Sequence, residues 1–173
     1  MPVTPLHFGV GMLGKGLFTR RVSLTAFVVS QIVIDVEVAY YMLVTHEWPF
    51  HRWAHTFLVG GLLGVLVGAG VVVGGRMLRA LAGSRWQVPD LSEASWQPAI
   101  VGGLLGGLTH PVLDGVMHDG IAPLRPFSLA NPFHQAVSMS VLHLGLVALA
   151  VVGGVLLVFV ARGLIGEAKA GAE

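Results

Sequence analysis

The stretch TFLVGGLLGVLVGAGVVVGG, residues 56–75, contains no charged side chain and consists almost entirely of glycine and aliphatic residues. About 20 such residues in a helix cross the ~30 Å hydrocarbon core of a bilayer. The whole chain has a similar character, since 54% of its 173 residues are hydrophobic and only 11% are charged. A soluble domain usually carries about 25% charged residues. We therefore expect an integral membrane protein.

Three further stretches, residues 22–44, 99–117 and 137–161, resemble the one at 54–75 in length and apolar character. Together they predict four membrane spans. A shorter apolar segment, residues 4–18, begins with Thr4 as a helix cap and Pro5 at the first helical position. We expect one all-α domain over residues 1–173, a polytopic membrane helix bundle with four full spans and a short N-terminal helix. Residues 76–97 are expected to form a polar linker, and residues 162–173 a short C-terminal tail.

The basic residues predict an orientation. If the spans alternate in direction, one side of the membrane receives Arg20, Arg21, Arg76, Arg79, Arg85 and Arg162. The other side receives only Arg52 and Arg125. Loops rich in Lys and Arg stay in the cytoplasm. We therefore expect the arginine-rich side to face the cytoplasm, in the plasma membrane of a bacterium (its inner membrane).

Composition also excludes some classes of function. The chain has no cysteine, so it forms neither a disulfide framework nor a thiolate metal site. Its formal net charge of +1 and its lack of long basic runs argue against nucleic acid as a partner.

Histidine and aspartate recur at helical spacing inside the apolar runs. HRWAH, residues 51–55, places His51 and His55 four residues apart, and THPVLDGVMHD, residues 109–119, places His110, Asp114 and His118 on one helical stripe. Pro111 disfavours a helical conformation at His110 and is expected to bend this stripe. Imidazole nitrogen and carboxylate oxygen are ligands that zinc accepts.

The rise of a helix gives each of these side chains a depth. At ~1.5 Å per residue, counted from the cytoplasmic ends of the spans, His7, Asp35, Glu37, His55, His110, Asp114 and His118 lie about 18–31 Å up. They therefore converge on one slab between mid-membrane and the outer interface. An ionisable group at the centre of a span costs ~2.5–3.5 kcal/mol on insertion, and a shared cation offsets much of that cost. We expect a divalent metal, Zn²⁺ by the chemistry of the ligands and alternatively Mn²⁺, bound as one or two ions.

Asp35 and Glu37 in IDVE, residues 34–37, are two apart and point about 200° away from each other on a regular helix. We expect Asp35 to be a metal ligand or a bridging carboxylate. Glu37 is expected either to orient a histidine or to act as general base for a metal-bound water. Both are our candidates for catalytic residues.

Other polar and small residues admit simpler interpretations. His46 and His143 are expected to bond backbone carbonyls, and His134 to lie in an interfacial loop. Arg52 and Arg125 flank the expected mouth of the site, where they either hold a substrate phosphate or extend to the interface. Small-xxx-small faces allow helices to pack closely, either within the chain or between copies in a homo-oligomer. The glycines at 60, 64, 68, 102, 103, 106 and 107 form such faces. The structural alternative is that Asp35 bonds a histidine of a neighbouring helix and holds the two helices together without a metal.

Five motifs occur in order between residues 4 and 134: TPLHFG, IDVE, HRWAHT, THPVLDGVMHD and APLRPFSLANPF. This set resembles an integral-membrane, metal-dependent hydrolase family of bacteria and archaea, which is similar to the zinc-dependent phospholipase C and single-strand nuclease superfamily. The resemblance implies a helical core that holds metal ions and a metal-bound hydroxide that attacks a phosphoester. The ligands it implies are His7, Asp35, His55, His110 and Asp114, with His118 and His134 as further candidates. The acid of an HxxxE pair is missing from HQAVS, residues 134–138, which favours one or two ions over three.

The function expected from these observations is hydrolysis of a phosphoester in a lipid or lipid-linked substrate by metal-activated water. The site would face the outer leaflet. A metal-ion transporter or a metal-sensing membrane protein is the alternative, since both also place His and Asp within spans. Intramembrane proteolysis is disfavoured because no HExxH motif occurs.

Overall fold

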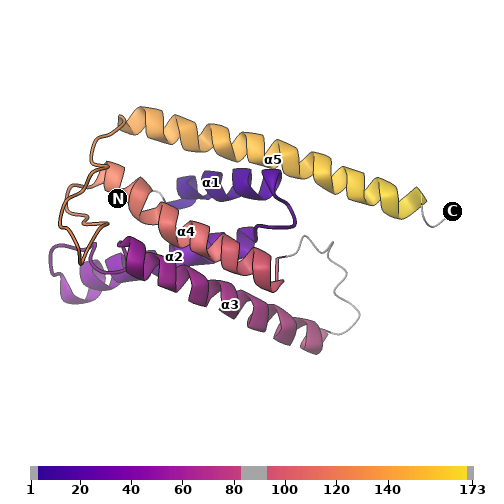
Figure 1. Ribbon diagram of the computed structural model, residues 1–173, viewed down its shortest axis with the longest axis horizontal. Coiled ribbons are helices and arrows are strands. Elements are labelled where there is room, and N and C mark those ends of the chain that lie inside the picture. The colour runs from indigo at the N-terminus through magenta and orange to yellow at the C-terminus, as the bar shows by residue number, and fades with distance from the viewer. Residues whose placement is uncertain (1–3, 83–92, 171–173) are drawn as a thin grey trace.

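The computed structural model describes residues 4–82 and 93–170, with side chains up to residue 163, and its regular elements over these ranges are helices, with no strand among them. The elements in chain order are α1 (Thr4–Leu17), α2 (Leu24–Tyr40), the π-helix η1 (Tyr41–Thr45), α3 (Phe57–Ala82), α4 (Trp96–Met117) and α5 (Met139–Ala170) (Figure 1).

The predicted membrane helix bundle is confirmed. Four helices are long and apolar enough to cross a bilayer: Leu24–Thr45, Phe57–Leu81, Trp96–Met117 and Met139–Gly163. The 14 residues of α1 extend only about 21 Å, which is less than the hydrocarbon thickness. The described residues therefore contain four helices able to span a membrane and one short N-terminal helix.

Several boundaries differ from the sequence prediction. α2 begins at Leu24 because the Ser23 side chain accepts a hydrogen bond from the Ala26 N–H and caps the helix. α3 continues through the predicted linker as far as Ala82, so Arg76 and Arg79 lie on a helix. Their segment is rich in Arg, Met, Leu and Ala, which favour helix even beyond the apolar run. Of the other charged residues of that linker, Arg85 and Asp90 lie outside the described residues, whereas Glu93 is described.

The structure also describes the start of the predicted tail and the segment around Pro111. The tail predicted from residue 162 is helical up to Ala170, because α5 runs on without a break. α4 also continues through Pro111 with His110 in helical conformation. The bulk of α4 lies against other helices, and tertiary packing can hold a proline within a helix despite its missing N–H.

Glycines bring α3 and α4 into backbone contact. A Cβ built on Gly107 would lie 2.1 Å from the Gly60 carbonyl oxygen, and one on Gly103 would lie 2.1 Å from that of Gly64. Gly68 makes the same approach to Ala99 one turn further along. The predicted small-residue faces thus pack helices within this chain, and those glycines are buried by that contact.

The helix α1 lies between α5 and the rest of the bundle (Figure 1). Gly9 of α1 approaches the backbone of Leu146, and Gly153 of α5 approaches that of Met12. α1 also contacts α2, where Gly11 meets the ring of Phe27. As a result the polar side chains of α1 are carried into the interior, His7 near one end and Lys15 near the other.

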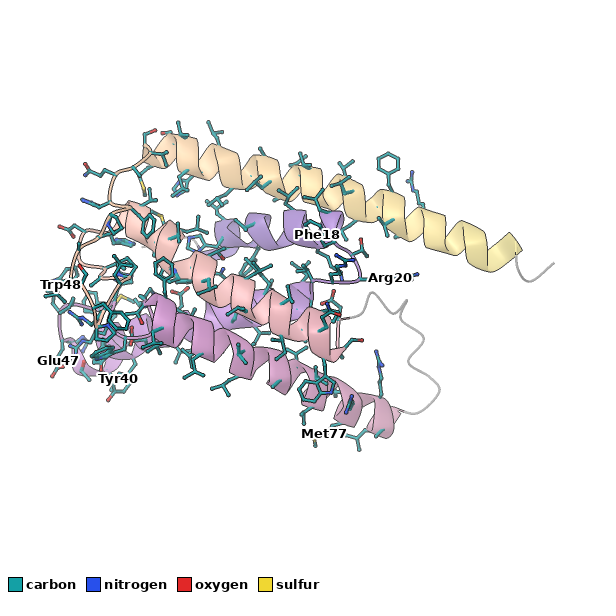
Figure 2. The ribbon with its side chains drawn as sticks, in the orientation of Figure 1. Phe18, Arg20, Tyr40, Glu47, Trp48 and Met77 are labelled. Carbon is teal, nitrogen blue, oxygen red and sulfur yellow. The ribbon has the colours of Figure 1, made fainter. Side chains whose placement is uncertain are left out.

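The two ends of the bundle differ in character. At one end lie η1 and the connections 46–56 and 118–138, and the exposed side chains there include Tyr40 at the end of α2 and Glu47 and Trp48 in the first connection (Figure 2). Arg20 lies in the α1–α2 turn and Met77 on the distal part of α3, away from that end (Figure 2). The arginines on either side of Met77 therefore share an end with Arg20, as the alternating spans predicted.

A buried ion pair ties the arginine-rich end together. Lys15 Nζ lies 2.7 Å from Glu93 Oε1, although the lysine side chain is only 1% exposed. The other oxygen of Glu93 accepts hydrogen bonds from Ser23 Oγ and from the Thr25 N–H at the start of α2, both at 2.8 Å. Burial alone raises the pKa of Glu93, but the hydrogen bonds from Lys15, Thr25 and Ser23 outweigh it and hold this pKa below its usual value.

Candidate metal centre

The structure brings the predicted ligands together at the end of the bundle opposite Arg20, Arg76 and Arg79. They come from four parts of the fold: His7 from α1, Asp35 from α2, His51 and His55 from the connection before α3, and His110, Asp114 and His118 from α4 and its C-terminal cap. His7, His51, His55, His110 and Asp114 are buried, and Asp35 and His118 are partly exposed. The predicted convergence at one depth therefore corresponds to a single cluster of side chains.

Four residues form the inner part of the cluster: Asp35, His55, His110 and Asp114 each offer a ligand atom within 4.8 Å of the others. His110 Nε2 lies 3.3 Å from Asp35 Oδ1 and 3.4 Å from Asp114 Oδ2. His55 Nε2 lies 3.7 and 3.6 Å from the same two oxygens. These separations exceed the 2.7–3.2 Å of N–H···O hydrogen bonds. Three of them match the spacing of neighbouring ligands around a tetrahedral ion, about 3.3–3.6 Å for bonds of about 2.0–2.2 Å, and the His55–Asp35 separation is slightly longer.

A second group shares one member with the first. His51, Asp114 and His118 also offer ligand atoms within 4.8 Å of one another. His51 Nε2 lies 3.7 Å from Asp114 Oδ2, and the His51 and His118 rings are stacked with centroids 4.7 Å apart. Asp114 therefore borders both groups. His7 faces the other oxygen of this carboxylate, with its Nε2 3.5 Å from Asp114 Oδ1.

The cluster contains buried polar atoms without hydrogen-bond partners among the described residues. They are both carboxylate oxygens of Asp114, the Nε2 atoms of His51, His55, His110 and His118, and Nδ1 of His7. More than nine in ten buried polar groups in proteins are hydrogen-bonded, so this concentration in one place requires a physical reason. Lone pairs of imidazole and carboxylate that face one another repel unless a proton or a metal cation lies among them. The donor set thus fits a divalent metal ion.

Glu37 holds Nδ1 of His55, the ring nitrogen that does not face the cluster. Glu37 Oε1 accepts hydrogen bonds from the Arg52 N–H at 2.7 Å and from His55 Nδ1 at 3.2 Å, and Oε2 accepts one from the Ala54 N–H at 2.9 Å. With Nδ1 held in this way, Nε2 of His55 is directed into the cluster. Of the two roles expected for Glu37, its contacts favour orienting a histidine over acting as general base, because both its oxygens already accept hydrogen bonds.

His110 is held in the same manner by Gln31, a residue that the sequence patterns did not single out. Nδ1 of His110 is hydrogen-bonded to Gln31 Oε1. A signal was present in the sequence, because Gln31 lies four residues before Asp35, on the same face of an otherwise apolar span.

The histidines in the connections differ in protonation. Burial lowers the pKa of His51 to about 4 and also lowers that of His118, so both rings are neutral and their lone pairs are available to a metal. Burial lowers the pKa of His55 as well, but the facing carboxylates of Asp114, Asp35 and Glu37 outweigh this effect and raise it to about 10. A metal that binds His55 must therefore displace a proton.

The two predicted phosphate-binding arginines have different surroundings. The Arg52 guanidinium donates to the carbonyl of Pro49 at 3.0 Å and to Glu47 Oε2 at 3.2 Å, and it stacks 3.7 Å above the Tyr41 ring. These contacts hold Arg52 away from the cluster and explain it as an interfacial residue. Arg125 is half-buried and lies 5.5 Å from the Trp53 ring centroid.

Four histidines lie outside the two ligand groups of the described chain: His7, which faces Asp114, and His46, His134 and His143. His46 and His134 are exposed, and His143 is half-buried on α5.

The fold and the cluster together define a class: an all-helical, four-span membrane protein with a buried His/Asp group that could hold a metal ion. No protein-family model, curated protein or solved structure matches this chain.

Proposed function

We propose that this protein is a membrane-embedded, metal-dependent hydrolase that cleaves a phosphoester of a lipid or lipid-linked substrate with metal-activated water. The observation that carries the proposal is the set of unpartnered lone pairs of Asp114 and the surrounding histidines. A site of this composition serves either to carry an ion or to use one chemically. The order and spacing of the sequence motifs, which resemble those of membrane metal-dependent hydrolases, favour the second.

We propose two ions that share Asp114. The group of Asp35, His55, His110 and Asp114 supplies the four ligands of a closed tetrahedral site. The group of His51, Asp114 and His118 supplies three, which is the number found in catalytic zinc sites that keep one position for water or substrate. Zinc suits this imidazole-rich, cysteine-free donor set, and manganese is the next candidate.

A divalent ion in the three-ligand group would lower the pKa of a bound water and neutralise charge on phosphoryl oxygens. The chain itself holds the ligands rigid through the Glu37–His55 hydrogen bond and the α3–α4 backbone contact. Asp35 has the most exposed side chain of the inner group, at 22%, whereas the other three ligands are buried. We therefore assign Asp35 as a ligand that also borders the side from which substrate arrives.

The position of the cluster supports a lipid substrate. It lies at the end of the bundle opposite the arginine-rich end, which the positive-inside rule assigns to the cytoplasm. The site would then face the outer leaflet of a plasma membrane, the inner membrane of a bacterium. There the phosphate of a lipid head group lies at the level of the connections that carry His51, His55 and His118.

The interior below the cluster favours hydrolysis over ion transport. Buried side chains between the cluster and the Lys15–Glu93 pair include Ala26, Phe27, Val72 and Ala99. Ser30 lies among them, but its hydroxyl donates to the carbonyl of Phe27 in its own helix. The described interior therefore offers a cation no continuous set of ligands from one end to the other.

The test is hydrolysis by the detergent-purified protein of a phospholipid or a lipid phosphate with added zinc or manganese. Asp114→Asn removes the shared negative charge while keeping the shape of the side chain, and His143→Ala serves as a control outside the ligand groups. We expect turnover in the wild type and the control and none in Asp114→Asn. Full turnover in Asp114→Asn, or metal flux into proteoliposomes without turnover, would contradict the proposal, and the second result would identify a transporter.

A further inference from the structure

Gln31 is a fully buried polar residue in the middle of α2, with 0% of its surface exposed. A buried amide without hydrogen bonds costs several kcal/mol in an apolar environment, so the bonds of Gln31 indicate what it does. Its Nε2 lies 3.3 Å from the carbonyl oxygen of Gly106 and 3.3 Å from Thr109 Oγ1, both on α4. Its Oε1 contacts Nδ1 of His110.

The orientation of the Gln31 amide follows from these neighbours. The Gly106 carbonyl can only accept a hydrogen bond, so it must face the NH₂ group. The Thr109 hydroxyl donates to the Leu105 carbonyl at 2.7 Å, which leaves its lone pairs for the same NH₂ group. A flipped amide would place two oxygens against each other at Gly106, and it could bond Thr109 only by taking that hydroxyl's hydrogen from the Leu105 carbonyl. The side-chain oxygen of Gln31 therefore faces His110.

The protonation of His110 follows in turn. An amide oxygen accepts but never donates, so Nδ1 of His110 must carry the hydrogen. In a neutral ring the other nitrogen, Nε2, is then the one with the lone pair. That nitrogen points at Asp35 Oδ1 and Asp114 Oδ2, 3.3 and 3.4 Å away.

We propose that Gln31 is a positioning residue that fixes the tautomer and ring orientation of His110, so that Nε2 is presented as a metal ligand. This inference rests on the proposed metal site. It makes α2 the organising helix of the centre, because α2 supplies the ligand Asp35 and also the two acceptors that fix histidines from other segments. Gln31 fixes His110 through a neutral amide, and Glu37 fixes His55 through a carboxylate.

The neutral acceptor has a chemical consequence. A carboxylate bonded to an imidazole N–H makes the other nitrogen a stronger ligand, whereas an amide does so less. Glutamate at position 31 could still accept from His110, and leucine could not. The two substitutions therefore separate the accepting oxygen from mere filling of space.

The experiment is competition for zinc between the purified full-length protein and a chromophoric chelator, in detergent. We expect Gln31→Leu to bind zinc about 10–100-fold more weakly, which is the usual effect of removing such a partner. Gln31→Glu should bind more tightly than Gln31→Leu, because it keeps the accepting oxygen although it loses the NH₂ bonds to Gly106 and Thr109. Ser30→Ala, which alters a buried polar neighbour bonded only to Phe27, should leave zinc affinity unchanged.

A second measurement determines the tautomer of His110 in the wild type, so its result does not depend on how the Gln31 variants fold. The ¹⁵N shifts of His110 in the zinc-loaded protein, assigned by their loss in His110→Ala, should show a protonated Nδ1 and a metal-bound Nε2. A proton on Nε2, or zinc affinity in Gln31→Leu equal to that of the wild type, would overturn the role of Gln31 while leaving the metal site standing. Absence of zinc binding in the wild type would instead overturn the proposed function and this inference with it.

Discussion

The contact between Gly107 and Gly60 should determine how far His55 lies from His110 and Asp114. Gly107 precedes His110 by less than one helical turn, and Gly60 follows His55 by little more than one. In Gly107→Ala the new Cβ would meet the Gly60 carbonyl oxygen at 2.1 Å. Ordinary contacts begin near about 3.4 Å, so α3 and α4 must separate by about 1 Å.

The effect of Gly107→Ala on the free energy of unfolding can be compared with that of Gly70→Ala, a matched control. A Cβ added to Gly70, also in α3, would have nothing within 4 Å of it, so Gly70→Ala gains only the helix propensity of alanine, about 1 kcal/mol. Gly107→Ala gains the same amount but suffers overpacking of about 1–3 kcal/mol. The two variants should therefore differ by about 1–3 kcal/mol in free energy of unfolding, or about 2–12 °C in melting temperature at ~2–4 °C per kcal/mol.

The same separation should weaken metal binding. A shift of about 1 Å takes the His55–Asp114 spacing beyond what a tetrahedral ion bridges, and we expect zinc affinity to fall at least about tenfold. Thermal unfolding in detergent and chelator competition measure the two effects. If Gly107→Ala has the same melting temperature as Gly70→Ala and the zinc affinity of the wild type, the glycine contact does not set the ligand spacing and the reasoning is wrong.

Three other outcomes are expected. His118→Ala should reduce bound zinc from about two ions per chain to about one in elemental analysis, because it removes a ligand only from the three-ligand group; an unchanged ratio would argue against two ions. Glu93 has a lowered pKa in the folded protein, so its contribution to stability is complete above the ordinary carboxyl pKa of about 4.3 and is lost as pH falls through the lower folded value. Melting curves between about pH 6 and about pH 3 should accordingly show a smaller loss on acidification in Glu93→Gln than in the wild type, and parallel curves would contradict this. Arg125→Ala should raise KM for an anionic lipid substrate, whereas Arg52→Ala should lower only the melting temperature, since Arg52 is bound to Pro49 and Glu47; equal effects on KM would remove the distinction.

Local sequence was enough to establish a membrane protein with four spans and a short N-terminal helix. Hydropathy and helix length are local properties, so those of an apolar run such as residues 56–75 do not depend on its tertiary contacts. The fixed rise of a helix also placed His7, Asp35, His110 and Asp114 at similar depth before any contact was known. Where the local signal was mixed, as in the arginine-containing end of α3, the predicted boundary was wrong.

Tertiary structure decided which way each side chain at that depth points. The partner of His110 is 79 residues away in the sequence. The helical spacing of Gln31 and Asp35 places both on one face of α2, but it does not show which side chain of another helix Gln31 will contact. The sequence left Glu37 as either a base or an orienting group. The structure shows that its oxygens accept hydrogen bonds from the backbone N–H groups of Arg52 and Ala54. Depth is set by each helix alone, whereas rotation about the helix axis is set by packing between helices. Here that packing depends on bare backbone contacts at glycines, which leave no trace in the pattern of polar residues.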